Sequence, residues 1–324
     1  MSEQKFPILM YHRVDDSAHM HKVGLNLSGE HCSLERFERH MGYLQRNHAV
    51  LSVPEIIHII NTGQKLPEKS VAVTFDDGTK DHCKVVLPIL ESMGIPATFF
   101  VMTDPLYGKL PSTFRLQLVT GDSSKIDEIA NEHVPEALRR FAPEHFDKYL
   151  RGIDVPDTRY LGESSQATRE IKYLLNSILS EGPRSDISKY LLEMIFPEES
   201  ESDIAQKMFL NEGDIKALYR KGMTIGSHCR SHNKLPTIVS DEVFYGEVVG
   251  SHTTLNGILG EGPEIIGYPS GGIEGLSDVR VQLIRETYLG GCTLINQTEV
   301  CSTRTDPFNM PRIHEHHFER LIAK

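Results

Sequence analysis

The chain has 324 residues, of which 39% are apolar and 24% are charged, as is typical of a globular protein with a substantial core. Its 34 basic and 45 acidic residues give a formal net charge of −11, which argues against nucleic acid as a partner. The five cysteines, at positions 32, 83, 229, 292 and 301, form no CxxC pair, and their odd number favours reduced thiols over a disulfide framework.

The amino-terminal residues, Met-Ser-Glu-Gln-Lys-Phe, open no long apolar stretch. No run along the chain reaches the ~18 apolar residues that a membrane span needs. We therefore expect a cytoplasmic protein without a transmembrane helix.

Short apolar runs alternate with helical patterns in the amino-terminal part of the chain, which predicts an α/β fold with a mainly parallel sheet or barrel. Ser33 is placed to cap a helix, Pro54 to open one and Gly94 to close one. The expected strands span residues 7–11, 48–53, 71–75 and 97–102, and the expected helices span 33–45, 54–61 and 84–93.

From about residue 105 the chain becomes charged and helical. Helices are expected at 126–130, 135–141, 167–179 and 187–195. Because the α/β rhythm then resumes, we expect one domain over residues 1–324, interrupted by a helical insertion at about 105–205. The insertion follows the carboxyl end of a strand, so we expect it to shape substrate access or to mediate oligomerisation.

Beyond the insertion, Asn211 is placed to cap a helix that ends near Arg220. Further helices are expected at 241–259 and 279–288. The expected strands span 223–226, 265–268, 292–295 and 310–313.

Two adjacent carboxylates, Asp76 and Asp77, follow the strand at 71–75 in the stretch Thr-Phe-Asp-Asp-Gly. Functional side chains of parallel α/β folds gather at the carboxyl ends of strands. Adjacent side chains diverge on an extended backbone, so one carboxylate can ligate a metal while its neighbour faces a bound water. Asp-Asp-Gly is also a common turn, and taken alone a helix cap with a solvated loop acid is the simpler explanation.

His228 and His232 also follow an expected strand. Four residues apart, they can face one ion if the segment turns helically. Two histidines and one aspartate make the three-ligand set of a catalytic zinc site, which keeps a position open for water. The chain has 16 histidines, so a chance surface pair is the simpler explanation of these two alone.

Together, these stretches resemble the polysaccharide deacetylase (NodB-homology) superfamily. Residues 74–78 match its first motif, and Ser-His-Cys-Arg-Ser-His at 227–232 matches its His-Ser/Thr-x-x-His motif, with Cys229 in the usual Ser/Thr place. Pro-Ala-Thr-Phe-Phe-Val at 96–101 matches the strand that follows the first motif, and Leu-Met-Tyr-His at 9–12 resembles the amino-terminal strand of one branch. The resemblance covers roughly residues 1–104 and 205–316.

The resemblance implies a distorted (β/α) barrel that removes an N-acetyl or other acyl group from an amino sugar by hydrolysis. It implies that Asp77, His228 and His232 hold a divalent metal and that Asp76 is the general base. Zinc is the first choice of metal, and cobalt, nickel and manganese also suit this ligand set. The expected partner is an N-acetylated sugar or glycan, and a homo-oligomer is left open.

The third motif departs from the family pattern. Many members have Arg-x-Pro-x-Gly, whereas this chain has Gly-Tyr-Pro-Ser-Gly at 267–271, so Gly267 stands where the Arg partner of the base is usual. Arg312 is the candidate replacement, and a surface salt bridge is an equal alternative for it.

In the family, a histidine near the end of a late strand protonates the leaving amine. His314, His316 and His317 lie there, and alternation on a strand would place His314 and His316 on one face with Arg312. His314 is the expected acid, and the alternative is an exposed tail with the acid elsewhere. His12 also ends a strand, and either lines the pocket or is structural.

Two rival functions stay open. One is a metal-dependent amidase or deformylase that acts on a small non-sugar amide. The other is a metal-binding, non-catalytic carbohydrate-binding homologue, which the missing motif-three Arg keeps in play.

Overall fold

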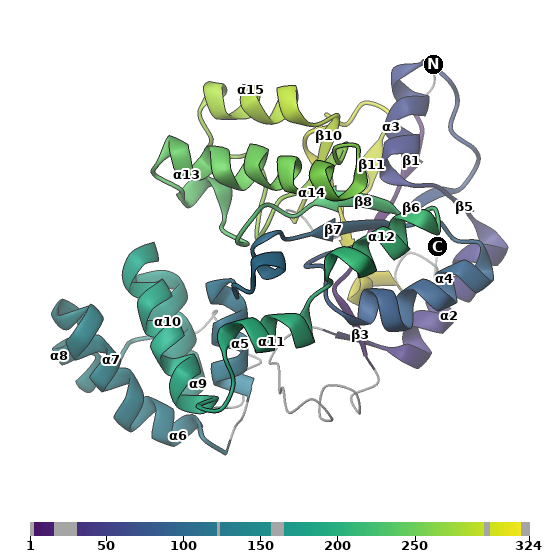
Figure 1. Cartoon of the computed structure of the whole chain (residues 1–324). Coiled ribbons are helices and arrows are strands. Elements are labelled where there is room, and N and C mark those ends of the chain that lie inside the picture. Colours follow the sequence, from purple (N-terminus) through teal and green to yellow (C-terminus); the bar gives the residue numbers. More distant parts are fainter. Residues whose placement is uncertain (1–2, 16–30, 122–123, 157–164, 295–298, 319–324) are drawn as a thin grey trace. The chain divides into compact units, whose positions relative to one another are not determined.

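The structure is a computed structural model that describes residues 3–15, 31–121, 124–156, 165–294 and 299–318. Its centre is a parallel sheet in which neighbouring strands follow the order β12-β10-β9-β8-β7-β6-β2-β13, with β5 also paired to β6 (Figure 1). The strands are β2 (Ile8–Tyr11), β5 (Ala49–Val50), β6 (Ser70–Phe75), β7 (Thr98–Val101), β8 (Thr224–Ser227), β9 (Ile265–Gly267), β10 (Gly290–Thr293), β12 (Met310–Pro311) and β13 (Ile313–His314).

The two end strands of this sheet belong to one stretch of chain. Met310 of β12 pairs with Cys292 of β10, and Ile313 of β13 pairs with Leu9 of β2. Arg312 alone separates β12 from β13, so the ends of the sheet meet and the sheet closes into a barrel. The predicted distorted (β/α) barrel is confirmed, and the strand expected at 310–313 is broken at Arg312.

Helices flank the barrel strands, and polar caps fix where several of them begin (Figure 1). Ser33 caps α2 as predicted, and Asn211 caps α12 in a reciprocal box with Asp214. Gly94 ends α4 in the left-handed region, with φ of 65°. These helices are α2 (Leu34–Asn47), α3 (Val53–Asn61), α4 (Leu87–Met93), α12 (Glu212–Arg220), α13 (Asp241–Tyr245), α14 (Ser251–Leu259) and α15 (Asp278–Thr287).

Two further predicted strands differ from the structure. The strand expected at 48–53 is limited to Ala49–Val50, because Ser52 caps α3 in a reciprocal box with Glu55. The strand expected at 292–295 is β10, which begins earlier, at Gly290, and Ile295 lies outside the described residues. The remaining strands are too short to leave a recognisable pattern in the sequence and were not predicted. They are β1 (Lys5–Phe6), β3 (Arg13–Asp15), β4 (His31–Ser33) and β11 (Cys301–Ser302).

Alternation along the strands divides the core into two faces. Val73 and Phe75 of β6 pack with the helices, in a cluster that includes Phe37 of α2. Ala72 of β6 packs instead with Phe100 and with residues of β2, β10 and β12, inside the barrel. Because both faces are covered, the strands read as nearly continuous apolar runs.

Residues 108–205 form a compact helical unit between β7 and β8 in the chain, with a core of its own. Leu138, Ile171, Leu174, Ile187 and Leu191 are all buried in it. Arg115 donates to the Glu201 carboxylate through Nε at 3.1 Å and Nη2 at 2.9 Å. Its helices are α5 (Ser112–Gly121), α6 (Ile126–Glu128), α7 (Val134–Phe141), α8 (Phe146–Leu150), α9 (Gln166–Tyr173) and α10 (Glu181–Ile195), and α11 (Glu201–Met208) leads out of it.

Candidate active site

The two aspartates lie where β6 ends. Asp76 continues the strand, because its N–H donates to Tyr11 O at 3.0 Å. Asp77 and Gly78 then adopt left-handed backbone angles, with φ of 76° and 68°. A Cβ on Gly78 would lie 3.1 Å from Val101 Cγ1, so a side chain there would crowd β7. This turn makes the two carboxylates diverge.

Asp77, His228 and His232 come together as the sequence predicted. Asp77 Oδ1 lies 3.4 Å from Nε2 of His228 and 3.3 Å from Nε2 of His232. All three side chains are buried or nearly so. Burial raises the pKa of Asp77, but the two imidazoles outweigh burial and hold this pKa well below its ordinary value.

These spacings fit a single metal ion. Ligand atoms about 2.0–2.1 Å from a tetrahedral zinc ion are separated by about 3.3–3.4 Å. Asp77 Oδ1 has this spacing to both imidazole nitrogens. Two imidazoles and one carboxylate are also ligands that zinc accepts in catalytic sites, with one position left for water.

The tautomer of His228 suits a ligand. Its Nδ1 lies 2.7 Å from the carbonyl oxygen of Gly267, which can only accept, so Nδ1 carries the proton. When the ring is neutral, as a metal ligand must be, Nε2 faces Asp77 with its lone pair. A carbonyl that receives the second ring N–H is the usual support of a metal-binding histidine.

The backbone between the histidines turns sharply, with φ of 60° at Cys229 and 62° at His232. Cys229 is fully buried and packs with Leu235, Phe244 and Tyr268. Its thiol therefore belongs to the core packing.

Arg312 is the partner of Asp76. Its Nη1 donates to Asp76 Oδ1 at 2.5 Å, and its Nη2 donates to Oδ2 at 2.8 Å. Arg312 is fully buried and also donates to Thr293 O and Thr74 Oγ1, so the surface salt bridge considered as its alternative is excluded. Burial raises the pKa of Asp76, but the charges of Arg312 and His228 outweigh it, and the pKa lies below its ordinary value.

The packing around Phe100 explains why Arg312 replaces an arginine at position 267. A Cβ on Gly267 would lie 2.7 Å from Cγ of Phe100, so no side chain fits there without moving the ring. The Arg312 guanidinium lies over the same ring, with Cζ 5.3 Å from its centroid. The Phe100 ring thus leaves no room for an arginine side chain at position 267 of β9, and it packs against the guanidinium of Arg312, which lies between β12 and β13.

Three histidines form a stack beside the two aspartates. The ring of His314 stacks on that of His12, with centroids 5.7 Å apart, and on that of His316, with centroids 4.5 Å apart. Burial lowers the pKa of His12 more than the charges of Asp77 and Asp76 raise it. Tyr11 of β2 pairs with Phe75 of β6, so His12 and Asp76 follow neighbouring strand ends, and His12 lies at the site, which the sequence left open.

A second cluster of metal-binding side chains contains Cys32, His40 and Glu315, all buried. Arg36 already balances its charge, because Nη2 donates to Glu315 Oε1 at 2.6 Å and Nε donates to Cys32 Sγ at 3.4 Å. Burial raises the pKa of Cys32 to about 11, so its thiol stays protonated near neutral pH. We interpret this cluster as structural.

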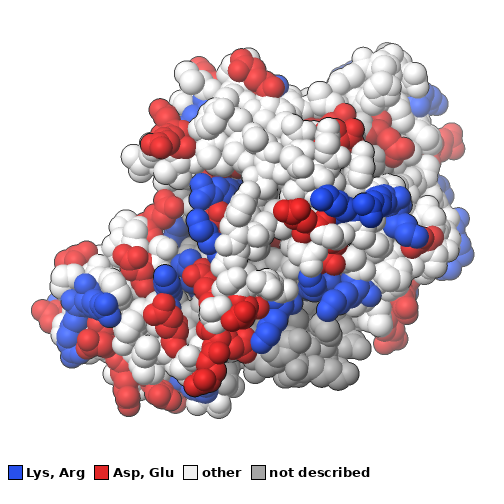
Figure 2. Space-filling view, in the orientation of Figure 1, with Lys and Arg blue, Asp and Glu red and all other residues white. Residues whose placement is uncertain are grey.

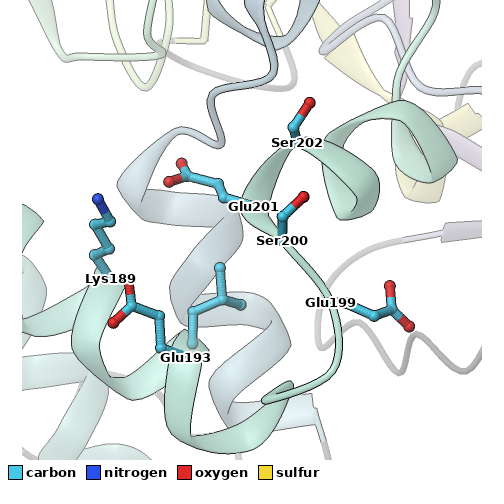
Figure 3. A pocket seen from close by; sticks show the side chains of 7 residues that line it. Lys189, Glu193, Glu199, Ser200, Glu201 and Ser202 are labelled. Atoms are coloured by element: carbon cyan, nitrogen blue, oxygen red, sulfur yellow. The ribbon is translucent and has the colours of Figure 1, made fainter.

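The helical unit has an acidic hollow of about 330 Å³ (Figure 3). Lys189 and Glu193 of α10 line one side, and Glu199 and Glu201 line the other. The Glu201 carboxylate accepts hydrogen bonds from Arg115 and from the N–H of Leu110, the latter at 2.7 Å, and so links α5 and α11 within the unit.

The surface carries both signs of charge. On the face seen in Figure 2, blue Lys and Arg side chains are interspersed with red Asp and Glu. Among the described helices, none is both long and apolar enough to cross a membrane.

Known proteins resemble this chain in both sequence and fold. A profile of the polysaccharide deacetylase family matches residues 63–141, which include Asp76 and Asp77 and extend into the helical unit. YxkH of Bacillus subtilis (strain 168), whose own assignment as a polysaccharide deacetylase is provisional, is 32% identical over 99 residues. That match spans 30% of this chain and 32% of YxkH.

Several solved structures share the fold over nearly the whole chain. The Streptococcus pyogenes deacetylase PplD, in complex with acetate, has a TM-score of 0.59 at 18% identity, covering 99% of this chain and 98% of that one. The Bacillus cereus polysaccharide deacetylase BC0361 has a TM-score of 0.54 at 20% identity, covering 99% and 69%. IcaB from Ammonifex degensii has a TM-score of 0.55 at 15% identity, covering 98% and 96%. In its barrel, its partial sequence match and its two motifs, the chain is similar to the polysaccharide deacetylase family.

Proposed function

We propose that the protein is a metal-dependent hydrolase that removes an N-acetyl group from an amino sugar or glycan. The observation that carries this proposal is one buried constellation. Asp77, His228 and His232 are spaced to hold a zinc ion, and the adjacent Asp76 is held by Arg312. The sequence match to the polysaccharide deacetylase family supports a deacetylase, and the structure of PplD, which shares the fold, was determined with acetate, the product of such a reaction.

A bound zinc ion supplies a Lewis acid that polarises an acyl carbonyl and lowers the pKa of water. Asp76 takes the proton of the attacking water as general base. Arg312 keeps Asp76 ionised and fixes both carboxylate oxygens, so the base is charged and oriented before substrate arrives.

The leaving amine needs a proton, and His314 is our first candidate for the acid. Its Nδ1 accepts the N–H of His316 at 3.3 Å, so a neutral His314 ring carries its proton on Nε2. To act as the acid, His314 must take a second proton and give up that hydrogen bond. His12, stacked on His314, is the alternative acid.

Identification of the product tests the proposal against its rivals. Purified protein loaded with zinc is incubated with N-acetylated amino sugars, with small N-formylated compounds that are not sugars, and with small primary amides. Acetate release, matched by new free amine and lost on chelation, supports the deacetylase. Formate or ammonia release identifies the deformylase or amidase, and tight sugar binding without any product identifies the non-catalytic homologue.

A further inference from the structure

The segment that carries His228 and His232 is a sharp turn with an unusual backbone. It begins at the end of β8 and adopts left-handed angles at Cys229 and His232. Such angles are uncommon for residues other than glycine and persist only where surrounding contacts hold them. Those contacts therefore determine how the two imidazoles are presented.

Glu247 provides a concentrated set of these contacts. Its Oε2 accepts the backbone N–H of Arg230 at 2.8 Å and that of Ser231 at 2.9 Å. Its Oε1 accepts the hydroxyl of Ser231. The side chain is 3% exposed, so one buried carboxylate satisfies three donors of the segment between the two histidines.

The helix that carries Glu247 also holds the start of the turn. Four residues after Glu247, and so on the same helix face, Ser251 Oγ lies 2.8 Å from Ser227 Oγ. Ser227 Oγ in turn accepts the N–H of Cys229 at 3.2 Å. Glu247 lies in a π-helical segment, Gly246–Gly250, between α13 and α14, and such one-turn irregularities often occur at functional sites.

We propose that Glu247 is a positioning residue that holds His228 and His232 at the spacing that binds metal. None of the three hydrogen bonds that Glu247 accepts from this turn comes from a histidine side chain. It acts through the backbone N–H groups of Arg230 and Ser231, which lie between them. The inference rests on the proposed metal site and adds a residue that the sequence motif does not contain.

The test measures zinc affinity of the full-length protein, by competition with a chromophoric chelator. Groups that orient metal ligands are worth about 10–100-fold in affinity, so we expect Glu247→Ala to raise the zinc dissociation constant by about that factor. Glu247→Gln keeps an oxygen that can accept both N–H groups, and we expect it to recover most of the lost affinity.

Two control variants separate positioning from general destabilisation. Val248→Ala truncates the next buried side chain of the same helix, and should lower the melting temperature with zinc affinity within about twofold of the parent. Glu242→Ala removes an exposed carboxylate of α13 and should change neither quantity. The inference is overturned if Glu247→Ala binds zinc as tightly as the parent, or if Val248→Ala loses as much affinity as Glu247→Ala. If the parent and a His228→Ala variant bind zinc equally, the proposed metal site itself is wrong, whatever the role of Glu247.

Discussion

Arg312 and Asp76 lie 236 residues apart in the chain, yet the arginine donates one hydrogen bond to each oxygen of the aspartate, at 2.5 and 2.8 Å. Barrel closure brings them together, because Arg312 is the single residue between the two strands that join the ends of the sheet. Both groups are buried, so each can stay ionised only because the charge of the other balances it. This pairing leads to the first two predictions.

Substitution of Arg312 by Lys should move the acidic limb of the kcat/KM profile to higher pH. The arginine charge and its two hydrogen bonds keep the pKa of Asp76 low against the opposing effect of burial. A lysine retains the charge and loses the paired geometry, so a larger share of Asp76 is protonated at a given acidic pH. The pH–rate profiles of the two proteins, at equal zinc content, measure this shift. An unchanged acidic limb would mean that Asp76 is not the base or that Arg312 does not control it.

Substitution of Asp76 by Asn should destabilise the protein by about 3–5 kcal/mol at neutral pH, because it leaves the buried Arg312 charge uncompensated. The pKa of Asp76 is lowered in the folded state, so its contribution is complete above the ordinary value and is lost as pH falls through the folded value. Urea unfolding of the metal-free proteins at several pH values should therefore show a difference that narrows in acid. A difference that stays constant down to low pH would contradict the assigned ion pair.

Replacement of His228 or His232 by Ala should remove the bound zinc. Each substitution deletes one of the three proposed ligands. The nitrogen atom of each histidine lies at the distance from Asp77 Oδ1 that separates two ligands of a tetrahedral zinc ion. Metal analysis after dialysis measures zinc per chain. His58→Ala, at an exposed histidine of α3, is the control and should keep the zinc of the parent. Parent-like zinc content in both ligand variants would place the metal elsewhere.

The acid can be identified by the basicity of the leaving amine. Loss of the acid should lower kcat by about 10²–10⁴-fold on an alkylamine leaving group, and much less on a weakly basic aromatic amine that departs without a proton. We expect this pattern for His314→Ala, and a smaller, leaving-group-independent loss for His12→Ala. The reverse assignment, with the pattern in His12→Ala alone, would make His12 the acid.

Gly267→Ala should destabilise the barrel by about 1–3 kcal/mol, because its methyl group meets the Phe100 ring. Gly267→Arg should likewise fail to restore activity to an Arg312 variant, since the ring blocks the path of a side chain from β9. Urea unfolding and activity measurements test these two statements. A stable, active Gly267→Arg, Arg312→Ala double variant would show that the Phe100 packing does not dictate the choice of arginine.

Local sequence patterns located most of the barrel and the candidate metal-binding triad. Helix caps such as Ser33 and Asn211, and buried strands such as β6, are set by neighbouring residues and could be predicted. Two short motifs also fixed Asp77, His228 and His232 relative to their strands. Arg312 could be named as a candidate partner of Asp76 because motif three lacks its arginine, but the pairing itself depends on barrel closure. The contacts of Glu247 depend on a helix that packs against a turn, and local pattern did not predict them. His12 was ambiguous because its neighbours come from distant strands.

In the proposed mechanism, Asp77 binds the metal and Asp76 transfers the proton. Acetate release from an N-acetylated amino sugar substrate, measured beside zinc content for the parent, Asp76→Asn and Asp77→Asn, tests it. We predict that Asp76→Asn keeps its zinc and loses activity by at least about 10²-fold, whereas Asp77→Asn loses both. An Asp76→Asn protein that binds zinc and releases acetate at the parental rate would contradict the proposed mechanism.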